Sequence, residues 1–215
     1  MELKRADFGF GRVVIDESGV ARRGLFRTRR VAWDEISEYA LEMTPTVDAS
    51  AYREYSLTPV GELAYLRDAV QGMHRAYLVH VELRGGAQPV AFGWRFRDAH
   101  LAVHEIVERV HGRLARRARD ELDRLGLTAF GPLGLAAESI AWGAKSLPRE
   151  RVEAIEIFDA KPLELRVMAR GETWPFARAP TRAIPNLLVA LALARDLGYA
   201  TRGNPLVRDV FARPG

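Results

Sequence analysis

Short apolar stretches alternate with turn residues along residues 12–42. The first stretch, residues 13–15, is β-branched and stops at the acidic turn Asp16 to Gly19, where glycine accepts a positive φ without steric cost. Apolar positions then return three times, at 20–26, 31–33 and 36–41. Short apolar stretches separated by turns about every eight residues are typical of an antiparallel meander. The pattern therefore predicts four consecutive strands.

A fainter copy of this pattern lies at residues 130–158. A repeat of roughly a hundred residues is much longer than the period of about 20–50 residues in solenoid proteins, so it indicates two similar domains. Aligning the copies pairs Val20 with Ile140, Val31 with Leu147, and residues 90–99 with residues 172–179, so that Trp94 lies over Trp174.

We therefore expect an α+β, mainly β fold of two domains, residues 1–125 and 126–215, each an antiparallel meander closed by a C-terminal helix. The first closing helix covers about residues 99–124, and its apolar stripe continues far enough to reach the second domain. The second covers about residues 184–198 and is apolar on every side, which predicts burial on every side. A C-terminal tail follows it.

Residues 77–83 and 90–96 alternate between apolar and polar side chains, with Gly85-Gly86 between them. Alternation with a period of two indicates a half-buried strand, so this segment predicts a β-hairpin. Its buried face is expected to carry Val90, Phe92, Trp94 and Phe96.

The first domain also carries an insertion at about residues 43–75 that the second domain lacks. A loop longer than about 15 residues in a compact domain is usually functional or disordered. Aromatic residues are enriched in protein interfaces, so three tyrosines of the insertion are candidate partner-binding residues: Tyr52, Tyr55 and Tyr65. Part of the insertion has helical spacing, with Leu63, Leu66, Val70 and Met73 on one face. The alternative is that the insertion folds back over an open sheet end.

The composition limits the possible classes of function. The absence of cysteine excludes disulfides and thiolate metal sites and is compatible with a reducing compartment. The N-terminus lacks the apolar core of a signal peptide, and no apolar run approaches the ~20 residues of a membrane span, so we expect a cytoplasmic protein. The net charge is only +4, and arginines are interleaved with acidic residues along most of the chain. A nucleic-acid partner is therefore not expected, because such proteins concentrate basic charge on one face.

One group of arginines is a candidate site for an anionic ligand: Arg22, Arg23, Arg27, Arg29 and Arg30. The acidic turn at Asp16 to Gly19 lies nearby and would itself repel phosphates. The other interpretation is a solvated strand edge and corner, whose charges discourage unwanted strand pairing.

Histidines on the first closing helix suggest a metal site, because imidazoles one helical turn apart can share a zinc ion. His100, His104 and His111 lie on one side of the helix together with Glu108, but the sequence H-E-x-x-H is absent. Half-buried histidines at the border of the apolar stripe explain the spacing without a metal. The chain also lacks G-x-S-x-G, a glycine-rich phosphate loop and a cysteine nucleophile. We therefore expect no metal, no cofactor and no enzymatic activity.

A meander of strands closed by one helix, here twice, resembles the pleckstrin-homology-like (PH-like) fold. The segment Val31 to Ile36 is similar to an apolar-x-Trp-x-Glu-Ile pattern in many uncharacterised bacterial members, and Ile184-Pro185-Asn186 at the start of the last helix is similar as well. The second copy departs from the pattern, since Arg149 occupies the position of Trp33. The resemblance implies two tandem, partly open barrels that act as non-catalytic modules binding peptides, proteins or lipid headgroups. Phosphoinositide-binding members carry a basic motif where this chain has its acidic turn.

These observations favour a protein–protein interaction module, with a protein partner or self-association at the insertion. The first alternative is peripheral binding to an anionic membrane through residues 22–30. The second is a small-ligand or enzymatic site between the two domains.

Overall fold

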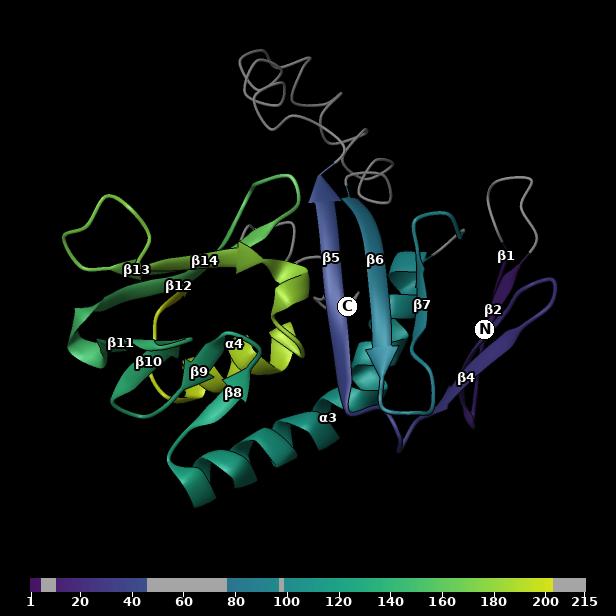
Figure 1. Cartoon of the computed structure of the whole chain (residues 1–215), viewed down its shortest axis with the longest axis horizontal. Helices are drawn as coiled ribbons and strands as arrows, with labels where there is room; N and C mark the ends of the chain where they lie inside the picture. Colours follow the sequence, from purple (N-terminus) through teal and green to yellow (C-terminus); the bar gives the residue numbers. More distant parts are fainter. Residues whose placement is uncertain (5–10, 46–76, 97–98, 203–215) are drawn as a thin grey trace, which may run out of the picture.

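The computed structural model describes residues 1–4, 11–45, 77–96 and 99–202. The first half begins with a four-stranded antiparallel sheet in the order β1-β2-β3-β4. A three-stranded sheet, β5-β6-β7, and the long helix α3 follow (Figure 1). Their bounds are β1 Glu2–Lys4, β2 Arg12–Asp16, β3 Gly19–Arg23, β4 Thr28–Ala32, β5 Glu38–Pro45, β6 Tyr77–Arg84, β7 Val90–Gly93 and α3 Ala99–Leu125.

The second half presents its elements in a similar order. A four-stranded antiparallel sheet, β11-β10-β9-β8, precedes a second sheet, β14-β13-β12-β15, in which β15 runs parallel to β12. The bounds are β8 Thr128–Phe130, β9 Leu133–Leu135, β10 Ser139–Trp142, β11 Lys145–Pro148, β12 Val152–Phe158, β13 Glu164–Ala169, β14 Ala177–Pro180, β15 Thr201–Arg202 and α4 Leu187–Asp196, with short 3-10 helices at Arg149–Arg151 and Thr181–Ala183. The fold is α+β and mainly β, as the sequence predicts.

Helix α3 links the two halves (Figure 1). It packs on β6 and β7 near its start and on β8 and α4 farther along. Its buried residues recur at the expected helical spacing: Val103, Ile106, Val110, Leu114, Ala118 and Leu122. The helix ends before Gly126, which has φ 71° and donates its N–H to the carbonyl of Leu122 at 2.7 Å. The expectation that this helix reaches the second half is therefore confirmed.

Strand β5 also connects the halves. One of its edges pairs with β6, and its other edge contacts the second half. At the other edge, the N–H of Asn186 donates to the carbonyl of Tyr39 at 2.8 Å, and the N–H of Tyr39 donates to Oδ1 of Asn186 at 2.9 Å. Farther along, the N–H of Leu163 donates to the carbonyl of Met43 at 2.9 Å. Asn186 has φ 54°, a left-handed conformation that asparagine adopts more readily than most residues. Its side chain thus takes the place of a neighbouring strand.

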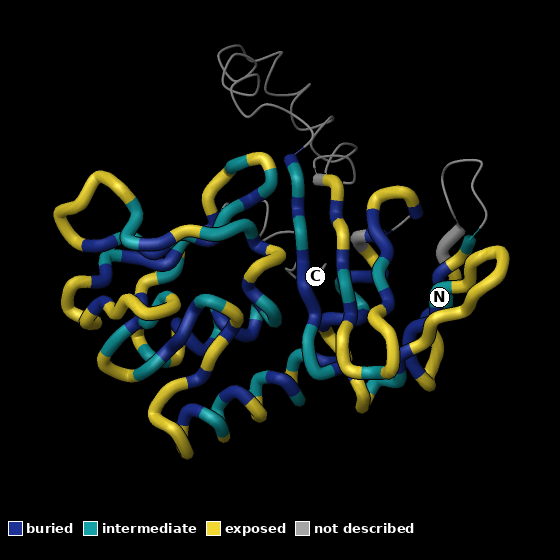
Figure 2. The backbone as a smooth tube through the Cα atoms, in the orientation of Figure 1, coloured by how far each residue is buried: buried dark blue, intermediate teal, exposed yellow. Residues whose placement is uncertain are grey.

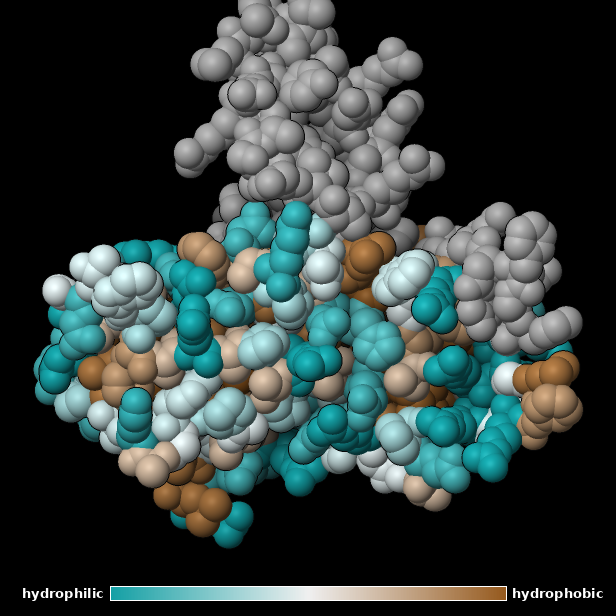
Figure 3. All heavy atoms as spheres, turned by 45° about the horizontal axis from the view of Figure 1, so that its top comes forward, coloured by the Kyte–Doolittle hydropathy of each residue, from teal (hydrophilic) through white to brown (hydrophobic). Residues whose placement is uncertain are grey.

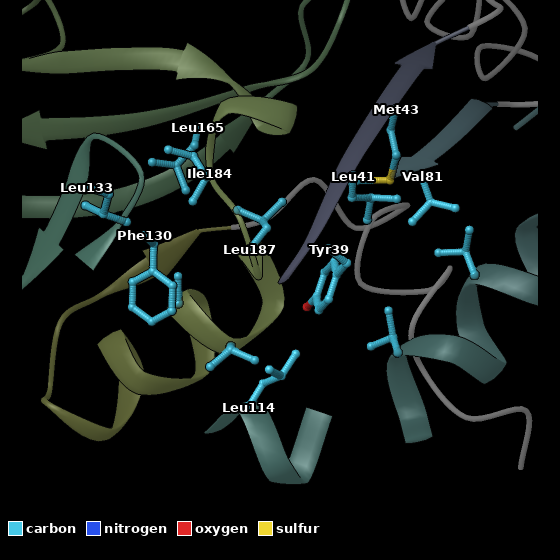
Figure 4. Close-up of a cluster of buried hydrophobic side chains, with 14 of the residues drawn as sticks. Tyr39, Leu41, Met43, Val81, Leu114, Phe130, Leu133, Leu165, Ile184 and Leu187 are labelled. Atoms are coloured by element: carbon cyan, nitrogen blue, oxygen red, sulfur yellow. The ribbon is translucent and has the colours of Figure 1, made fainter. Parts of the chain in front are cut away.

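Buried side chains from both halves meet at this joint and belong to one continuous core (Figure 4). Tyr39 is fully buried, and its hydroxyl accepts a hydrogen bond from the N–H of Leu188 at 3.3 Å. Burial raises the pKa of Tyr39 far above its usual value. Helix α4 lies between its own sheets and α3, with Leu187, Ala190 and Leu193 among its buried residues. The helix therefore packs between its own sheets and another element, α3, as predicted. Leu188, Leu191 and Leu197 are only partly buried, so the prediction of burial on every side is wrong.

Several predicted boundaries differ from the structure. Strand β5 continues through Met43, which is fully buried opposite Val79, to Pro45, so the insertion begins later than the sequence predicts. Strand β3 ends at Arg23 instead of continuing to residue 26. The predictions for the insertion, including Tyr52, Tyr55 and Tyr65 and the helical spacing at residues 63–73, lie outside the described residues, as does the C-terminal tail beyond residue 202.

The prediction that Trp94 is buried is wrong. Strand β7 ends at Gly93, whose carbonyl accepts the N–H of Phe96 at 2.9 Å, so the chain turns at Trp94. The indole is therefore 54% exposed and lies beside the guanidinium of Arg95, 5.3 Å from its centroid. Its alignment with Trp174 is also wrong, because Trp94 follows the third strand of its sheet whereas Trp174 precedes β14. Within the described residues, no helix is long and apolar enough to cross a bilayer.

Candidate functional site

The β3–β4 hairpin projects from the right-hand edge of the molecule in Figure 1. Its strands pair from Gly19↔Ala32 to Arg23↔Thr28, and the N–H of Gly24 closes the turn on the carbonyl of Arg27 at 2.8 Å. Val20 and Val31, near the base, are fully buried. Every residue from Arg23 to Arg30 is exposed (Figure 2). The outer part of the hairpin therefore extends beyond the core.

The register of these strands places arginines directly opposite one another. Arg22 lies opposite Arg29, and Arg12 of β2 lies opposite Arg23. Like charges at directly opposed positions destabilise an antiparallel pair. Residues 20–33 contain no acidic side chain. All five arginines predicted as an anionic-ligand site thus lie on one hairpin, and two of them, Arg22 and Arg29, face each other across it.

Two of these five arginines are tied into the fold. Nη1 of Arg22 donates to the carbonyl of Ala91 at 2.7 Å. Arg30 donates to Asp16 at 3.3 Å and to the hydroxyl of Ser18. The hydroxyl and N–H of Ser18, together with the charge of Arg30, lower the pKa of Asp16 and keep this carboxylate ionised. The acidic turn between β2 and β3 is therefore partly neutralised by Arg30.

The other three arginines surround an apolar tip. Within the part of the chain that the structure describes, no carboxylate pairs with Arg23, Arg27 or Arg29. Between them the turn presents Leu25, which is 62% exposed, and Phe26, which is 91% exposed. Figure 3 shows apolar atoms at this outer edge of the molecule, next to hydrophilic surface. The hairpin thus combines arginines that have no carboxylate partner among the described residues with two exposed apolar side chains.

The corresponding hairpin of the second half has neither feature. Its buried pair, Ile140↔Leu147, matches the predicted alignment with Val20 and Val31, but its strands end at Trp142↔Lys145 and turn at residues 143–144. Val20 and Val31 are 11 positions apart, whereas Ile140 and Leu147 are 7 positions apart, so the second hairpin is four residues shorter. The longer hairpin with its apolar tip is a property of the first half alone.

The sequence predicts the five arginines as a surface site but does not predict the exposure of Leu25 and Phe26. These two residues resemble a continuation of the strand, because they follow the apolar and β-branched positions that begin at Val20. The sequence does contain a signal for a turn here: Gly24 precedes the two apolar residues, and Arg27 and Thr28 follow them. Glycine within a strand pattern often marks a turn or irregularity.

The segment containing Trp33 serves as a structural corner. Nε1 of Trp33 donates to the carbonyl of Asp16 at 2.8 Å, and the carboxylate of Glu35 accepts the N–H of Ala32 at 2.9 Å. Arg113 of α3 donates to the carbonyl of Trp33 at 2.8 Å. These contacts explain the spacing of the Trp and Glu positions, because each side chain fixes a backbone group of the corner.

The helix histidines do not assemble a metal site within the described residues. Nδ1 of His104 lies 3.8 Å from Glu108, which is a long ion-pair distance. His111 is half-buried, and burial followed by the charge of Arg195 lowers its pKa. The side chain of His100 lies outside the described residues.

A cavity of about 150 Å³ lies at the joint between the halves. It is smaller than the ~300–1,000 Å³ typical of ligand pockets. The hydroxyl of Thr128, in its lining, donates to Glu121 at 3.0 Å. Other lining residues are Glu38, Leu114, Arg117, Phe130 and Asn186. This geometry gives less support to a small-ligand site between the halves than to a surface site.

The chain matches a known protein family. Residues 11–113 match the model of the bacterial PH domain family, bPH_6, which spans β2 to β7 and the first part of α3. No curated protein matches the chain. The match supports a PH-like domain in the first half of the chain, and domains of this family are typically non-enzymatic binding modules.

Proposed function

We propose that this PH-like protein is a non-enzymatic, peripheral binding module that docks on an anionic membrane surface through its β3–β4 hairpin. The observation that carries the proposal is the outer end of this hairpin, where Arg23, Arg27 and Arg29 lack a carboxylate partner within the described residues. A membrane rich in acidic lipids would supply the missing negative charge. The cytoplasmic leaflet is such a surface, which agrees with the cytoplasmic location expected from the sequence.

Electrostatic magnitudes support this geometry. A basic side chain close to an anionic bilayer contributes about 1 kcal/mol to binding. The three arginines without a carboxylate partner among the described residues therefore contribute about 3 kcal/mol, or more than a hundredfold in affinity. Binding also relieves the repulsion between Arg22 and Arg29, which face each other across the hairpin.

The acidic turn does not oppose this orientation, because it lies at the other end of β3. Strand β3 spans Gly19–Arg23, so at about 3.4 Å per residue the acidic end of the strand is about 14 Å from Arg23. Arg29 lies opposite Arg22 and is about 10 Å from that end. The Debye length is about 8 Å at physiological ionic strength. Repulsion between the acidic turn and a membrane touching the hairpin tip is therefore strongly screened.

Vesicle sedimentation tests the proposal. The wild-type chain is mixed with vesicles of phosphatidylcholine alone and with vesicles containing about one third phosphatidylglycerol, at low and high salt. We expect binding to the anionic vesicles only, and we expect it to fall steeply towards 1 M salt, where the Debye length shrinks to about 3 Å. The double variant R27E/R29E should bind at least ~30-fold more weakly, because it loses two favourable charges of about 1 kcal/mol each.

A variant with the same change in net charge serves as the matched control. R116E/R124E reverses two exposed arginines of α3, far along the chain from the hairpin. It should retain most of the binding if the hairpin is the contact. Equal losses in both double variants would show that net charge alone matters, and absence of binding by the wild-type chain would refute the proposal.

We further infer that the chain comprises two PH-like units, residues 1–125 and 126–215. The order of elements supports this inference, since each half has a four-stranded sheet, further strands and a helix. The matched buried pairs Val20↔Val31 and Ile140↔Leu147 support it as well. On this view the second unit serves to position the first, because its Asn186 and Leu163 occupy the free edge of β5.

A protein partner at the insertion is a second proposed function. The described residues make it testable, because Pro45 and Tyr77 are strand partners, so residues 46–76 can be removed and the ends joined. Replacing residues 46–76 with Asn-Gly should keep the β5–β6 pairing, since this dipeptide favours two-residue hairpin turns. Partner capture from the native host should then be lost, whereas a variant with alanine at Tyr52, Tyr55 and Tyr65 would localise the contact. Unchanged capture by the deletion variant would exclude the insertion as the interface.

A further inference from the structure

The tip of the β3–β4 hairpin carries a feature that charge attraction alone does not explain. Leu25 is 62% exposed and Phe26 is 91% exposed, and the two are adjacent at the turn. Single exposed apolar residues are common on protein surfaces. Two adjacent ones at the farthest point of a projecting hairpin, surrounded by arginines, form a combined apolar and cationic surface.

We propose that Leu25 and Phe26 insert into the bilayer as a wedge, while the flanking arginines remain at the level of the lipid phosphates. This inference rests on the membrane-docking function proposed above and specifies how deeply the hairpin enters. The apolar side chains leave water for the upper acyl region, and Arg27 on one side and Arg23 on the other keep their charges among the headgroups. Long arginine side chains are suited to this position, because the aliphatic stem lies along apolar surface while the guanidinium stays in polar surroundings.

The backbone of the tip is suited to shallow insertion. The N–H of Gly24 already donates to the carbonyl of Arg27 across the turn, which leaves fewer unpaired backbone groups to lose water. The backbone groups of Leu25 and Phe26 lie within the turn and would remain at the polar interface. The geometry therefore matches an interfacial position about 5–10 Å deep rather than a deeper one.

Charge complementarity favours a membrane over a second copy of this chain as the occupant. The tip is surrounded by arginines that no carboxylate pairs with in the described part of the chain, so two copies meeting tip to tip would bring like charges together. The hairpin of the second half offers an internal comparison. Its turn at Gly143-Ala144 has no large apolar side chain, so it lacks the means to insert.

These 215 residues contain no cysteine, which makes a direct test possible. A single cysteine is introduced at Phe26 (F26C) and labelled with an environment-sensitive fluorophore, and the same label is placed at Ala144 (A144C), on the exposed turn of the second hairpin. Both proteins are mixed with phosphatidylcholine vesicles and with vesicles containing phosphatidylglycerol, including vesicles with brominated acyl chains. We expect a blue shift and bromine quenching of the label at position 26 with anionic vesicles, and neither effect at position 144.

A second measurement uses the unlabelled chain. The variants L25S and F26S should bind anionic vesicles about tenfold or more weakly than the wild-type chain, because each loses the burial of a large apolar side chain. They should retain the salt dependence, since the arginines are unchanged. The variant A144S is the matched control and should bind as the wild-type chain does.

The outcomes separate this inference from the function on which it rests. If the wild-type chain binds anionic vesicles but the label at position 26 is not quenched and F26S binds normally, the wedge is refuted and the electrostatic docking stands. If the wild-type chain binds no vesicles, both fail. A blue shift at position 26 on mixing with unlabelled protein in the absence of lipid would overturn the inference in favour of a protein contact.

Discussion

Replacing Asn186 with alanine tests whether the joint between β5 and the second half stabilises the whole fold. The side chain accepts the N–H of Tyr39 at 2.9 Å, and Tyr39 is fully buried. Removing the acceptor leaves a buried donor without a partner, which costs about 1–3 kcal/mol. Alanine must also adopt the left-handed conformation of Asn186, φ 54°, at a cost of about 1–2 kcal/mol. We expect N186A to lower the free energy of unfolding by roughly 2–4 kcal/mol.

Urea unfolding followed by circular dichroism and tryptophan fluorescence would measure this loss. Thermal unfolding should show a decrease of about 5–15 °C, since 1 kcal/mol corresponds to roughly 2–4 °C for a chain of this size. Two further variants separate the contributions. N186G accepts the backbone conformation but lacks the acceptor, so it should recover about 1 kcal/mol relative to N186A. N186D keeps the acceptor for Tyr39 but loses the amide that donates to the carbonyl of Ser37 at 3.4 Å, so its stability should lie between those of N186A and the wild-type chain. A change of less than about 0.5 kcal/mol for N186A would show that the joint does not contribute in this way.

Two other predictions concern the first half. G85A should destabilise the fold by more than about 3 kcal/mol, because a Cβ at Gly85 would lie 1.7 Å from the carbonyl oxygen of Glu35. G112A should instead stabilise the fold by about 1 kcal/mol, because Gly112 lies on the exposed face of α3 and nothing lies within 4 Å of the added Cβ. Similar effects of the two substitutions on the free energy of unfolding would contradict the structure. The free energy of unfolding should fall as the pH decreases from 7 to 5, because burial holds the pKa of His111 below its usual 6.5 and the unfolded chain takes up a proton that the folded chain resists. H111Q should show a flatter dependence over this range in urea titrations at several pH values; an unchanged slope would mean that His111 contributes nothing to it.

The sequence predicts the local features of this fold well. The repeated apolar pairs, Val20 with Val31 and Ile140 with Leu147, and the extent of α3 follow from patterns within a short stretch of chain. The five arginines are visible as a local cluster in the sequence. These features share one property, which is that the signal and the contact lie close together in sequence.

The features that the sequence analysis missed depend on where the sheets end. Leu25, Phe26 and Trp94 continue an apolar pattern, but the core beneath them ends before the pattern does. The contact between Tyr39 and Asn186 joins residues 147 positions apart, so no local periodicity reports it. The resemblance of Ile184-Pro185-Asn186 to a family pattern marked the right place but not the reason, which is that Asn186 bonds to the edge of β5.

This separation between Tyr39 and Asn186 has a consequence for the newly made chain. A ribosome adds about 5–20 residues per second, so residue 186 is added roughly 7–30 s after residue 39, which lies 147 positions earlier. Mixed α/β domains fold in milliseconds to seconds, so the first half has time to form before its edge is covered. During this interval one side of β5 is open to pairing with strands of neighbouring chains. The protein is therefore most vulnerable to aggregation while it is being synthesised, and slower translation of its second half should lower the yield of native protein.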